Sequence, residues 1–154
     1  MPLEIERKFL LRNDSWRRAV IRSVPLAQGY LSVDPLRTVR VRVAGDRAWL
    51  TVKGPVVGIT RAEFEYPVPV TEATAMLALC PQPVVEKTRH YVPVGAHVWE
   101  IDVFTGANAG LVLAEVELAA PDENITLPGW VGEEVSGQAR YYNSSLLRLP
   151  YCDW

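Results

Sequence analysis

Two carboxylates and one ammonium are spaced two residues apart near the start of the chain, in the sequence EIERK. They belong to Glu4, Glu6 and Lys8. The surrounding residues 3–11 are bounded by turn-forming residues, which is typical of a β-strand. Alternate side chains of a strand point to the same face. The spacing therefore predicts one face with two carboxylates, which can bind a divalent cation, and an ammonium, which can bind an anion.

Six further stretches of the chain place charged residues at alternate positions. The charged residues that share a face within their stretch are Arg40 and Arg42, Lys53, Arg61 with Glu63 and Glu65, Lys87 with Arg89, Glu100 with Asp102, and Glu115 with Glu117. With the first stretch, the charged faces hold eight carboxylates and seven cations. The opposite faces are rich in Val, Ile, Leu and Trp. A solvated face usually mixes both charge signs with neutral polar side chains, so the segregation favours charges that converge inside the molecule.

Apolar outer faces and charged inner faces together predict an inside-out barrel with a charged lumen. Charges in a narrow lumen must be paired, hydrated or bound to a ligand. Clustered carboxylates without His or Cys favour a hard ion such as Mg²⁺ or Mn²⁺. Clustered arginines suit the oxygens of phosphate groups. The residues alone therefore indicate chemistry on a phosphate chain.

Alternation, turn residues and helix caps predict eight strands and three helices. The strands are expected at 3–11, 27–33, 38–43, 48–54, 60–70, 84–94, 97–106 and 111–119. The helices are expected at 14–23, at 72–80 with Thr71 as N-cap, and at 138–148. Long parallel crossovers are mostly absent, so the sheet should be antiparallel. Since closure removes exposed edges, we expect an α+β, mainly β fold: a closed eight-stranded antiparallel β-barrel over residues 1–154 as a single domain.

The bulk properties limit the classes of function. The chain has 154 residues and a net charge of −2, with no long basic run that would favour nucleic acid. It has no apolar stretch long enough to span a bilayer. Cys80 and Cys152 lack a metal-ligand spacing and are expected to be reduced thiols, as are typical of a cytoplasmic protein. We expect a small-molecule partner, no nucleic acid and no membrane, and leave homodimerisation open.

The same residues carry a resemblance to a known family. The motifs, in order, are EIERK at 4–8, QGYL at 28–31, TVRVR at 38–42, TVKG at 51–54, RAEFEY at 61–66, EKTRHYV at 86–92, WEIDVF at 99–104, AEVEL at 114–118 and EEVSGQARYYNSSL at 133–146. In this combination the chain resembles the CYTH superfamily of triphosphate tunnel metalloenzymes from residue 3 to about residue 148. It is most similar to the short bacterial and plant-type members, several of which resemble inorganic triphosphatases. The family fold is a closed eight-stranded antiparallel barrel whose tunnel binds triphosphate and metal.

The resemblance implies a role for each charged residue. The implied metal ligands are Glu4, Glu6, Glu115 and Glu117, and the implied orienting acids are Glu63, Glu65, Glu100 and Asp102. The implied substrate-binding bases are Lys8, Arg40, Arg42, Lys53, Lys87, Arg89 and, near the tunnel mouth, Arg140. Lys8, Arg42 and Lys87 are expected to act on the transferred phosphoryl group. Ser136 and Gln138 depart from the family pattern, where a Thr and an Asp are expected.

The implied reaction is metal-dependent hydrolysis of a triphosphate phosphoanhydride, most simply inorganic tripolyphosphate to diphosphate and phosphate. Mg²⁺ or Mn²⁺ would be the cofactor, and no Ser, Cys or His is placed to act as a nucleophile. Three alternatives remain open: a class IV-type adenylate cyclase, a thiamine triphosphatase, and a catalytically silent binder of triphosphate or polyphosphate. A thiamine triphosphatase would need an aromatic platform, for which Trp49 or Tyr30 could serve. We expect both of these side chains to be packing residues instead.

Overall fold

The structure is a computed structural model and describes residues 2–154 of the chain. It contains nine β-strands. They are β1 (Leu3–Leu11), β2 (Arg22–Ser32), β3 (Thr38–Ala44), β4 (Arg47–Lys53), β5 (Thr60–Val68), β6 (Val85–Val94), β7 (His97–Phe104), β8 (Val112–Glu117) and β9 (Val131–Glu134).

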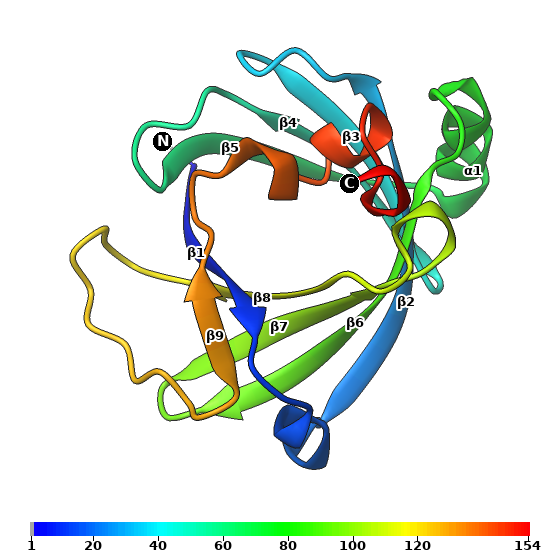
Figure 1. The fold of residues 1–154 in the computed structure, drawn as a ribbon. Coiled ribbons are helices and arrows are strands. Elements are labelled where there is room, and N and C mark those ends of the chain that lie inside the picture. The colour runs from blue at the N-terminus through cyan, green and yellow to red at the C-terminus, as the bar shows by residue number, and fades with distance from the viewer. Residues whose placement is uncertain (1) are drawn as a thin grey trace.

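Eight of these strands close into a barrel. Their order is β5-β4-β3-β2-β6-β7-β8-β1, and the first and last strands pair with each other. Glu4 of β1 lies opposite Arg61 of β5 at this closing seam. Every pairing in the ring is antiparallel, and Figure 1 shows the ring from one end. The predicted closed eight-stranded antiparallel barrel is confirmed.

The ninth strand, β9, was not predicted. It lies beside the end of β1, with Phe9 opposite Glu134 and Leu11 opposite Val131. The edge of β1 that faces away from β8 is thus shared between β5, along its first residues, and β9, along its last residues. A four-residue segment carries too little alternation to be identified as a strand from the sequence, and its pairing depends on an edge that only closure creates.

The predicted helix at 14–23 is wrong in type and length. A 3-10 helix, η1, covers Ser15–Ala19, and β2 already begins at Arg22 instead of at the predicted residue 27. Residues 22–28 pair with β6 along their whole length, with Arg22 opposite Tyr91. Seven consecutive sheet pairings outweigh the weak helical pattern of this segment. The one strong apolar residue of the pattern, Trp16, is fully buried.

The one α-helix among the described residues, α1, covers Val70–Leu79 rather than the predicted 72–80. Its N-cap is Pro69 instead of Thr71, so the helix starts directly after β5. The predicted helix at 138–148 is also wrong. Its place is taken by two 3-10 turns, η3 (Ala139–Tyr141) and η4 (Ser145–Leu147), because Tyr142 between them has an extended backbone with ψ 134°. None of the helices in residues 2–154 has the length and apolar character needed to cross a bilayer.

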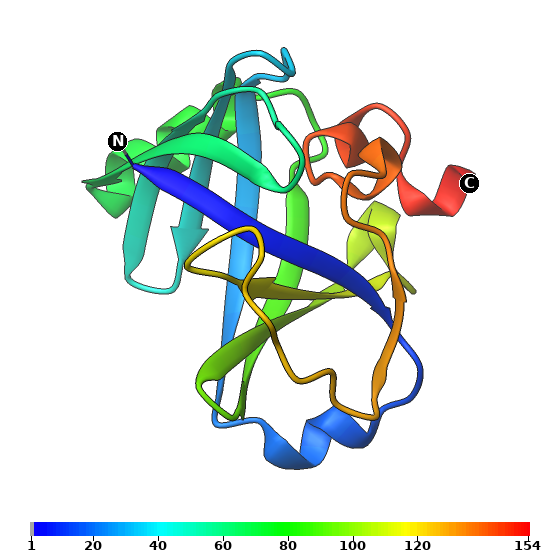
Figure 2. The ribbon, with the colours of Figure 1, turned by 90° about the vertical axis from the view of Figure 1, so that its left-hand side faces the viewer.

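Two further 3-10 turns complete the chain. They are η2 (Gly106–Asn108), between β7 and β8, and η5 (Tyr151–Asp153), at the C-terminus. The backbone N–H of Tyr151 donates a 2.9 Å hydrogen bond to Oδ1 of Asn108, which ties the C-terminus to the end of the barrel. Figures 1 and 2 show the C-terminal segment at the same end of the barrel from two directions.

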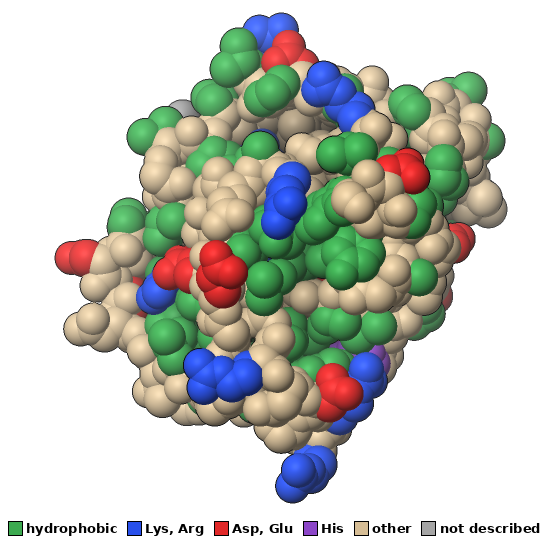
Figure 3. Space-filling model, viewed as in Figure 1, with side chains coloured by type: hydrophobic (Ala, Val, Ile, Leu, Met, Phe, Trp, Pro, Cys, Tyr) green, Lys and Arg blue, Asp and Glu red, His purple; other side chains and the backbone are tan. Residues whose placement is uncertain are grey.

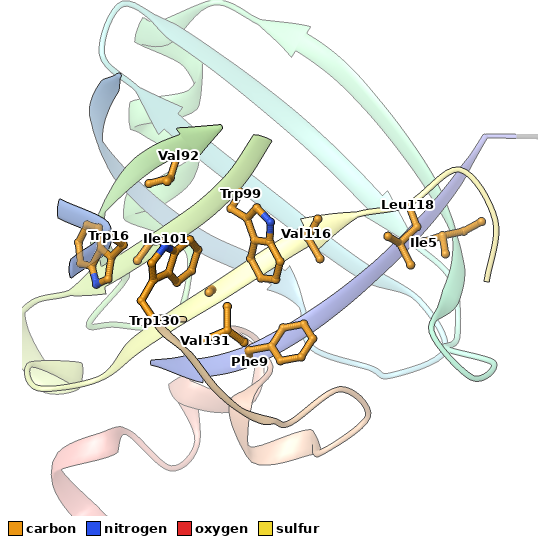
Figure 4. Close-up of a cluster of buried hydrophobic side chains, with 11 residues drawn as sticks. Ile5, Phe9, Trp16, Val92, Trp99, Ile101, Val116, Leu118, Trp130 and Val131 are labelled. Atoms are coloured by element: carbon orange, nitrogen blue, oxygen red, sulfur yellow. The ribbon is translucent and has the colours of Figure 1, made fainter. Parts of the chain in front are cut away.

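The main hydrophobic core lies outside the barrel wall rather than in the lumen. The ring centroids of Trp99, on β7, and Trp130, in the segment that leads to β9, are 5.4 Å apart (Figure 4). Phe9 and Ile101 are buried in the same cluster, together with Trp16. The segment between β8 and β9 crosses the outer face of β1, β7 and β8 and covers it (Figure 2).

Helix α1 covers a second part of the outer face. Ala73 is fully buried against Val41 of β3 and Ala48 of β4. The helix end also approaches β2 at Gly29, where an added Cβ would lie 2.8 Å from both Cβ and Sγ of Cys80. Only glycine allows the helix to pack this close to the sheet.

We predict that Gly29→Ala destabilises the protein by about 1–3 kcal/mol, because the new methyl group has to push α1 away from β2. The measurement is the free energy of unfolding in urea. The matched control is Gly129→Ala, since no atom lies within 4 Å of the position of its added Cβ. Equal stabilities of the two variants would contradict this account of the contact.

Candidate active site in the barrel lumen

The lumen contains a cavity of about 280 Å³ whose wall is formed mainly by charged side chains. Each barrel strand contributes at least one inward-facing residue to it. The sequence-predicted residues that line the cavity are Glu4, Glu6, Lys8, Arg40, Arg42, Lys53, Glu63, Glu65, Lys87, Arg89, Glu100, Glu115 and Glu117. The C-terminal segment lies across this end of the barrel and leaves a hollow beside it (Figure 3). The alternation of charges in seven separate stretches thus corresponds to one site.

Asp102 anchors the basic part of the wall. Its side chain is fully buried and accepts hydrogen bonds from Lys87 Nζ at 2.7 Å and from Arg89 Nε at 2.8 Å. Burial alone would raise the pKa of Asp102, but attraction to Arg89 and Lys87 outweighs burial and holds the pKa far below its usual range. Asp102 is not among the lining residues of the cavity. It lies behind them and fixes the two bases, an arrangement that fits the predicted orienting role.

Lys53 is fixed in a similar way by acids of two neighbouring strands. Its Nζ lies 2.9 Å from Oε2 of Glu4 and 3.2 Å from Oε2 of Glu63. Burial would raise the pKa of Glu4, but the charge of Lys53 lowers it to about 2. The pKa of Glu63 is raised to about 7, because the carboxyl is buried and hydrogen-bonds to Glu4. Lys53 is therefore a cation shared between two carboxyl groups.

Two arginines of the lumen lack enough hydrogen-bond acceptors or anions to compensate their charge. Arg42 makes one hydrogen bond to protein, from Nε to Oε1 of Gln28 at 2.9 Å, and no ion pair within residues 2–154. Burial, followed by the charges of Arg40 and Arg89, lowers the pKa of Arg42 to about 9. Arg40 is partly compensated, because its Nη2 lies 3.5 Å from Oε2 of Glu65, but within residues 2–154 its buried Nε has no hydrogen-bond partner. Both arginines project from β3, so this wall presents positive charge to the cavity.

Some carboxylates on the opposite wall also lack compensation. Glu6 of β1 lies directly across from Glu117 of β8, and neither forms an ion pair within the described chain. Burial, then the charges of Glu115 and Glu4, raises the pKa of Glu6 to about 8. Burial and Glu4 also raise the pKa of Glu117. The lumen therefore holds surplus negative charge along β1 and β8 and surplus positive charge along β3.

The acidic wall fits a hard divalent cation, which the sequence predicts. Its donors are carboxylate oxygens, and the pKa values of Glu6 and Glu117 are raised because burial and neighbouring carboxylates outweigh the attraction of nearby lysines. Across residues 2–154, however, no three acidic, His or Cys side chains converge as a ready-made ligand cage. Glu115 is held by Lys8 at 3.4 Å and by Arg89 at 3.7 Å. Glu6 and Glu117 are thus the carboxyls most available to an ion.

The C-terminal segment contributes residues that the sequence did not predict. Asn143 reaches the lumen, where its Oδ1 accepts hydrogen bonds from Lys87 and Gln28. Tyr142, Ser136 and Ser144 also line the cavity. Ser136 Oγ accepts a hydrogen bond from the backbone N–H of Lys8 and donates one to Glu134. These residues belong to an irregular segment without strand or helix periodicity, so spacing could not show which of its side chains face the cavity, although the segment is part of the family motif at 133–146.

The structure does not bring Arg140 to the cavity. Its guanidinium lies over the ring of Trp154, 4.6 Å from the centroid, and donates a 3.1 Å hydrogen bond to the hydroxyl of Tyr141. The side chain is exposed and is not among the lining residues. Its backbone lies in the short turn η3 instead of in the predicted helix.

One end of the lumen is apolar. Val85, Phe104 and Leu113 are buried there against Tyr141 and Leu146 of the C-terminal segment. A second cavity of about 630 Å³ adjoins the charged one and shares Arg42, Glu65 and Arg89 with it. Trp49 lines this second cavity, and Tyr30 lines the charged one while being buried in the core.

Comparisons with known proteins point in the same direction as this geometry. The chain matches the CYTH domain family over residues 2–148. It is 46% identical over 154 residues to a protein of Acetivibrio thermocellus named inorganic triphosphatase, with 98% of this chain and 97% of that protein covered. A protein of Nitrosomonas europaea with the same name is 36% identical, with coverage of 96% and 99%. A crystal structure of an inorganic triphosphatase superposes with a TM-score of 0.68 at 34% identity, covering 96% of this chain and 95% of that one.

The raised pKa of Glu6 predicts that metal binding depends on pH. At pH 7 this carboxyl holds a proton that a divalent ion must displace, so Mg²⁺ affinity should rise with pH until about pH 8 and then level off. Calorimetry at pH 7 in buffers of different ionisation enthalpy should show release of about one proton per ion. Glu6→Gln should abolish this release, and Glu72→Gln on the exposed face of α1 should not. An affinity that stays constant from pH 6 to 9 would contradict the assignment.

Proposed function

Because the chain belongs to the CYTH domain family, we propose that it is a divalent-metal-dependent inorganic triphosphatase that hydrolyses tripolyphosphate to diphosphate and phosphate. The two relatives with whole-length matches carry the name inorganic triphosphatase, which supports this substrate over a nucleotide. The family resemblance read from the sequence is confirmed by the match over residues 2–148.

The observation that carries the proposal is the separation of uncompensated charge across one lumen. Among the described residues, Arg42 on β3 forms no ion pair, and its neighbour Arg40 has one anion, Glu65, and a buried Nε without a hydrogen-bond partner. On the opposite wall, Glu6 and Glu117 form no ion pair with a described residue. A polyanion alone would satisfy only the first wall, and a metal ion alone only the second. A triphosphate together with a divalent ion satisfies both, which matches the donor chemistry of each wall.

The chain's own residues would bind and orient the phosphates. Lys87 and Arg89, held by Asp102, and Arg42, held by Gln28, are aimed at the cavity before substrate arrives. Such preorganised cations stabilise the charge that develops on phosphoryl oxygens in the transition state. In the reaction, a water oxygen bonds to the terminal phosphorus and the bridging P–O bond breaks. The bridging oxygen leaves with diphosphate.

We assign the metal to Glu4, Glu6, Glu115 and Glu117, with Glu6 and Glu117 as its first anchors. Mg²⁺ or Mn²⁺ fits this all-oxygen donor set. A bound ion of this kind supplies Lewis-acid neutralisation of phosphate oxygens. Glu63, Glu65, Glu100 and Asp102 would keep the bases oriented, as the contacts of Glu63 with Lys53 and of Glu100 with Arg89 suggest.

The two cysteines bear on the location of the protein. Cys80 and Cys152 are both free thiols, which supports the proposal of a cytoplasmic protein. The triphosphate substrate is a small molecule. Homodimerisation and independence from nucleic acid and membrane stay predictions.

We predict that tripolyphosphate is hydrolysed with a higher kcat/KM than ATP, and that cyclic AMP is at most a trace product. The lumen binds phosphates through charge, so a nucleoside should add little stabilisation of the transition state. The measurement is initial rates on tripolyphosphate, ATP and thiamine triphosphate, with Mg²⁺ and then Mn²⁺. Faster turnover of ATP, with Trp49 and Tyr91 of the second cavity as a platform, would favour a nucleotide enzyme. Cyclic AMP as the main product would favour the cyclase.

We predict that Arg42→Ala raises the activation free energy for tripolyphosphate hydrolysis by about 2–4 kcal/mol, because it removes a preorganised cation whose terminal nitrogens are available to substrate. The quantity to compare is kcat/KM of the variant with that of the parent protein. Arg18→Ala, which removes an exposed arginine from η1, is the matched control and should change the rate little. A rate within twofold of the parent would exclude Arg42 from the site.

A further inference from the structure

Gln28 and Asn143 form a bridge of two amides between two cations of the lumen. Gln28 Oε1 accepts a hydrogen bond from Arg42 Nε at 2.9 Å, and Gln28 Nε2 donates one to Asn143 Oδ1 at 2.9 Å. Asn143 Oδ1 also accepts a hydrogen bond from Lys87 Nζ at 2.8 Å. Gln28 is fully buried on β2, whereas Asn143 comes from the C-terminal segment between η3 and η4. The bridge therefore connects β3, β2, the C-terminal segment and β6.

The chemistry of the two cations fixes the orientation of both amides. Arginine and lysine side chains only donate hydrogen bonds, so the atoms that face them must be the amide oxygens. With its oxygen turned to Arg42, Gln28 has only its NH₂ group left for Asn143. The Asn143 oxygen then accepts from two donors at once. Neither amide can flip without placing two donors against each other.

The bridge also orients the N–H groups of both cations. The Lys87 ammonium has three N–H groups. Asp102 accepts one at 2.7 Å and Asn143 accepts a second, which leaves the third for the cavity that Lys87 lines. Arg42 is held at Nε, which leaves its two terminal nitrogens for a ligand. A triphosphate would therefore meet two cations whose donors are already aimed.

We propose that Gln28 and Asn143 are a pair of positioning residues that aim Arg42 and Lys87 at the phosphate chain, so that docking of the C-terminal segment completes the site. The inference rests on the proposed triphosphatase function. Neither amide carries charge, so both act through the cations they hold. The charge of Lys87 should be sensitive to the loss of such an acceptor. Burial and the charges of Arg89 and Arg42 lower the pKa of Lys87, and the attraction of Asp102 and Glu115 only partly offsets this.

The chain offers a direct test that does not depend on turnover. It has three lysines, Lys8, Lys53 and Lys87, and all of them line the lumen cavity. Lysine labelled with ¹³C and ¹⁵N therefore gives three side-chain signals, and Lys87→Arg identifies the relevant one. Each signal can be titrated with pH in the intact protein without substrate.

Asn143→Ala should lower the titration midpoint of Lys87 by about one pH unit, because the charged form loses an acceptor. Asn143→Asp should raise the midpoint, because the acceptor gains a negative charge. If Asn143 only filled space, its two variants would not shift the titration midpoint of Lys87 in opposite directions. Asn124→Ala and Asn124→Asp, at an exposed position of the segment before β9, are the matched controls and should leave Lys87 unchanged. A Lys87 midpoint that both Asn143 variants leave in place would overturn the proposal.

Kinetics then test whether the two amides act as one unit. Gln28→Met keeps the side-chain volume and so avoids an empty cavity, while it removes the two hydrogen bonds of the bridge and the longer one to Tyr30. Gln28→Met and Asn143→Ala should each lower kcat/KM for tripolyphosphate at least tenfold, and the double variant should lose much less than the product of the two factors. Independent, multiplicative losses would overturn the pairing. If the parent protein fails to hydrolyse tripolyphosphate, the proposed function is wrong. The lysine titration still tests whether Asn143 acts on Lys87, because it needs no turnover.

Discussion

Closing an antiparallel sheet on itself forces every second side chain of eight strands into one lumen, and this constraint governs the rest of the structure. The charged residues lie at the inward positions, so the usual arrangement of a protein interior is reversed. Apolar side chains such as Trp99 and Ile101 face outward and have to be covered by other parts of the chain. Helix α1, η1 and the segment between β8 and β9 supply that cover, and the hydrophobic core becomes a shell around the barrel.

Charges inside such a barrel cannot all be satisfied by one another. Asp102 illustrates the satisfied case, because two cations hold its carboxylate ionised in a fully buried position. Glu6 and Arg42 illustrate the unsatisfied case, with their pKa values moved to about 8 and about 9 in the directions that reduce charge. Burial of unpaired charge is unfavourable, so these groups lower the stability of the empty protein and favour a ligand that compensates them. The residues that form the candidate binding site are thus the same residues that lower the stability of the fold.

The sequence predicted the parts of the structure that depend on alternation. Arg40 and Arg42 alternate with valines, of which Val41 is fully buried, and their inward direction could be read from spacing alone. The closure of eight strands followed from the same pattern. The strand β9 and the 3-10 turns of the C-terminal segment could not be read, because they depend on an edge and on contacts that exist only after the barrel has closed. Gln28 is in phase with the inward positions of β2, yet a neutral side chain in a strand gives no sign that it orients an arginine.

The C-terminal segment joins the stability of the fold to the geometry of the site. Its apolar residues Tyr141 and Leu146 pack against the inward-facing Phe104 and Leu113, where the lumen loses its charge. Asn143 lies between these two anchors in the sequence, so hydrophobic packing on both sides brings a neutral acceptor to the Lys87 ammonium. A charged residue at this place would disturb the balance of the lumen, and an apolar one would leave Lys87 without its second acceptor. Apolar contacts therefore hold the C-terminal segment in place, and the amide oxygen of Asn143 connects this segment to a cation of the candidate site.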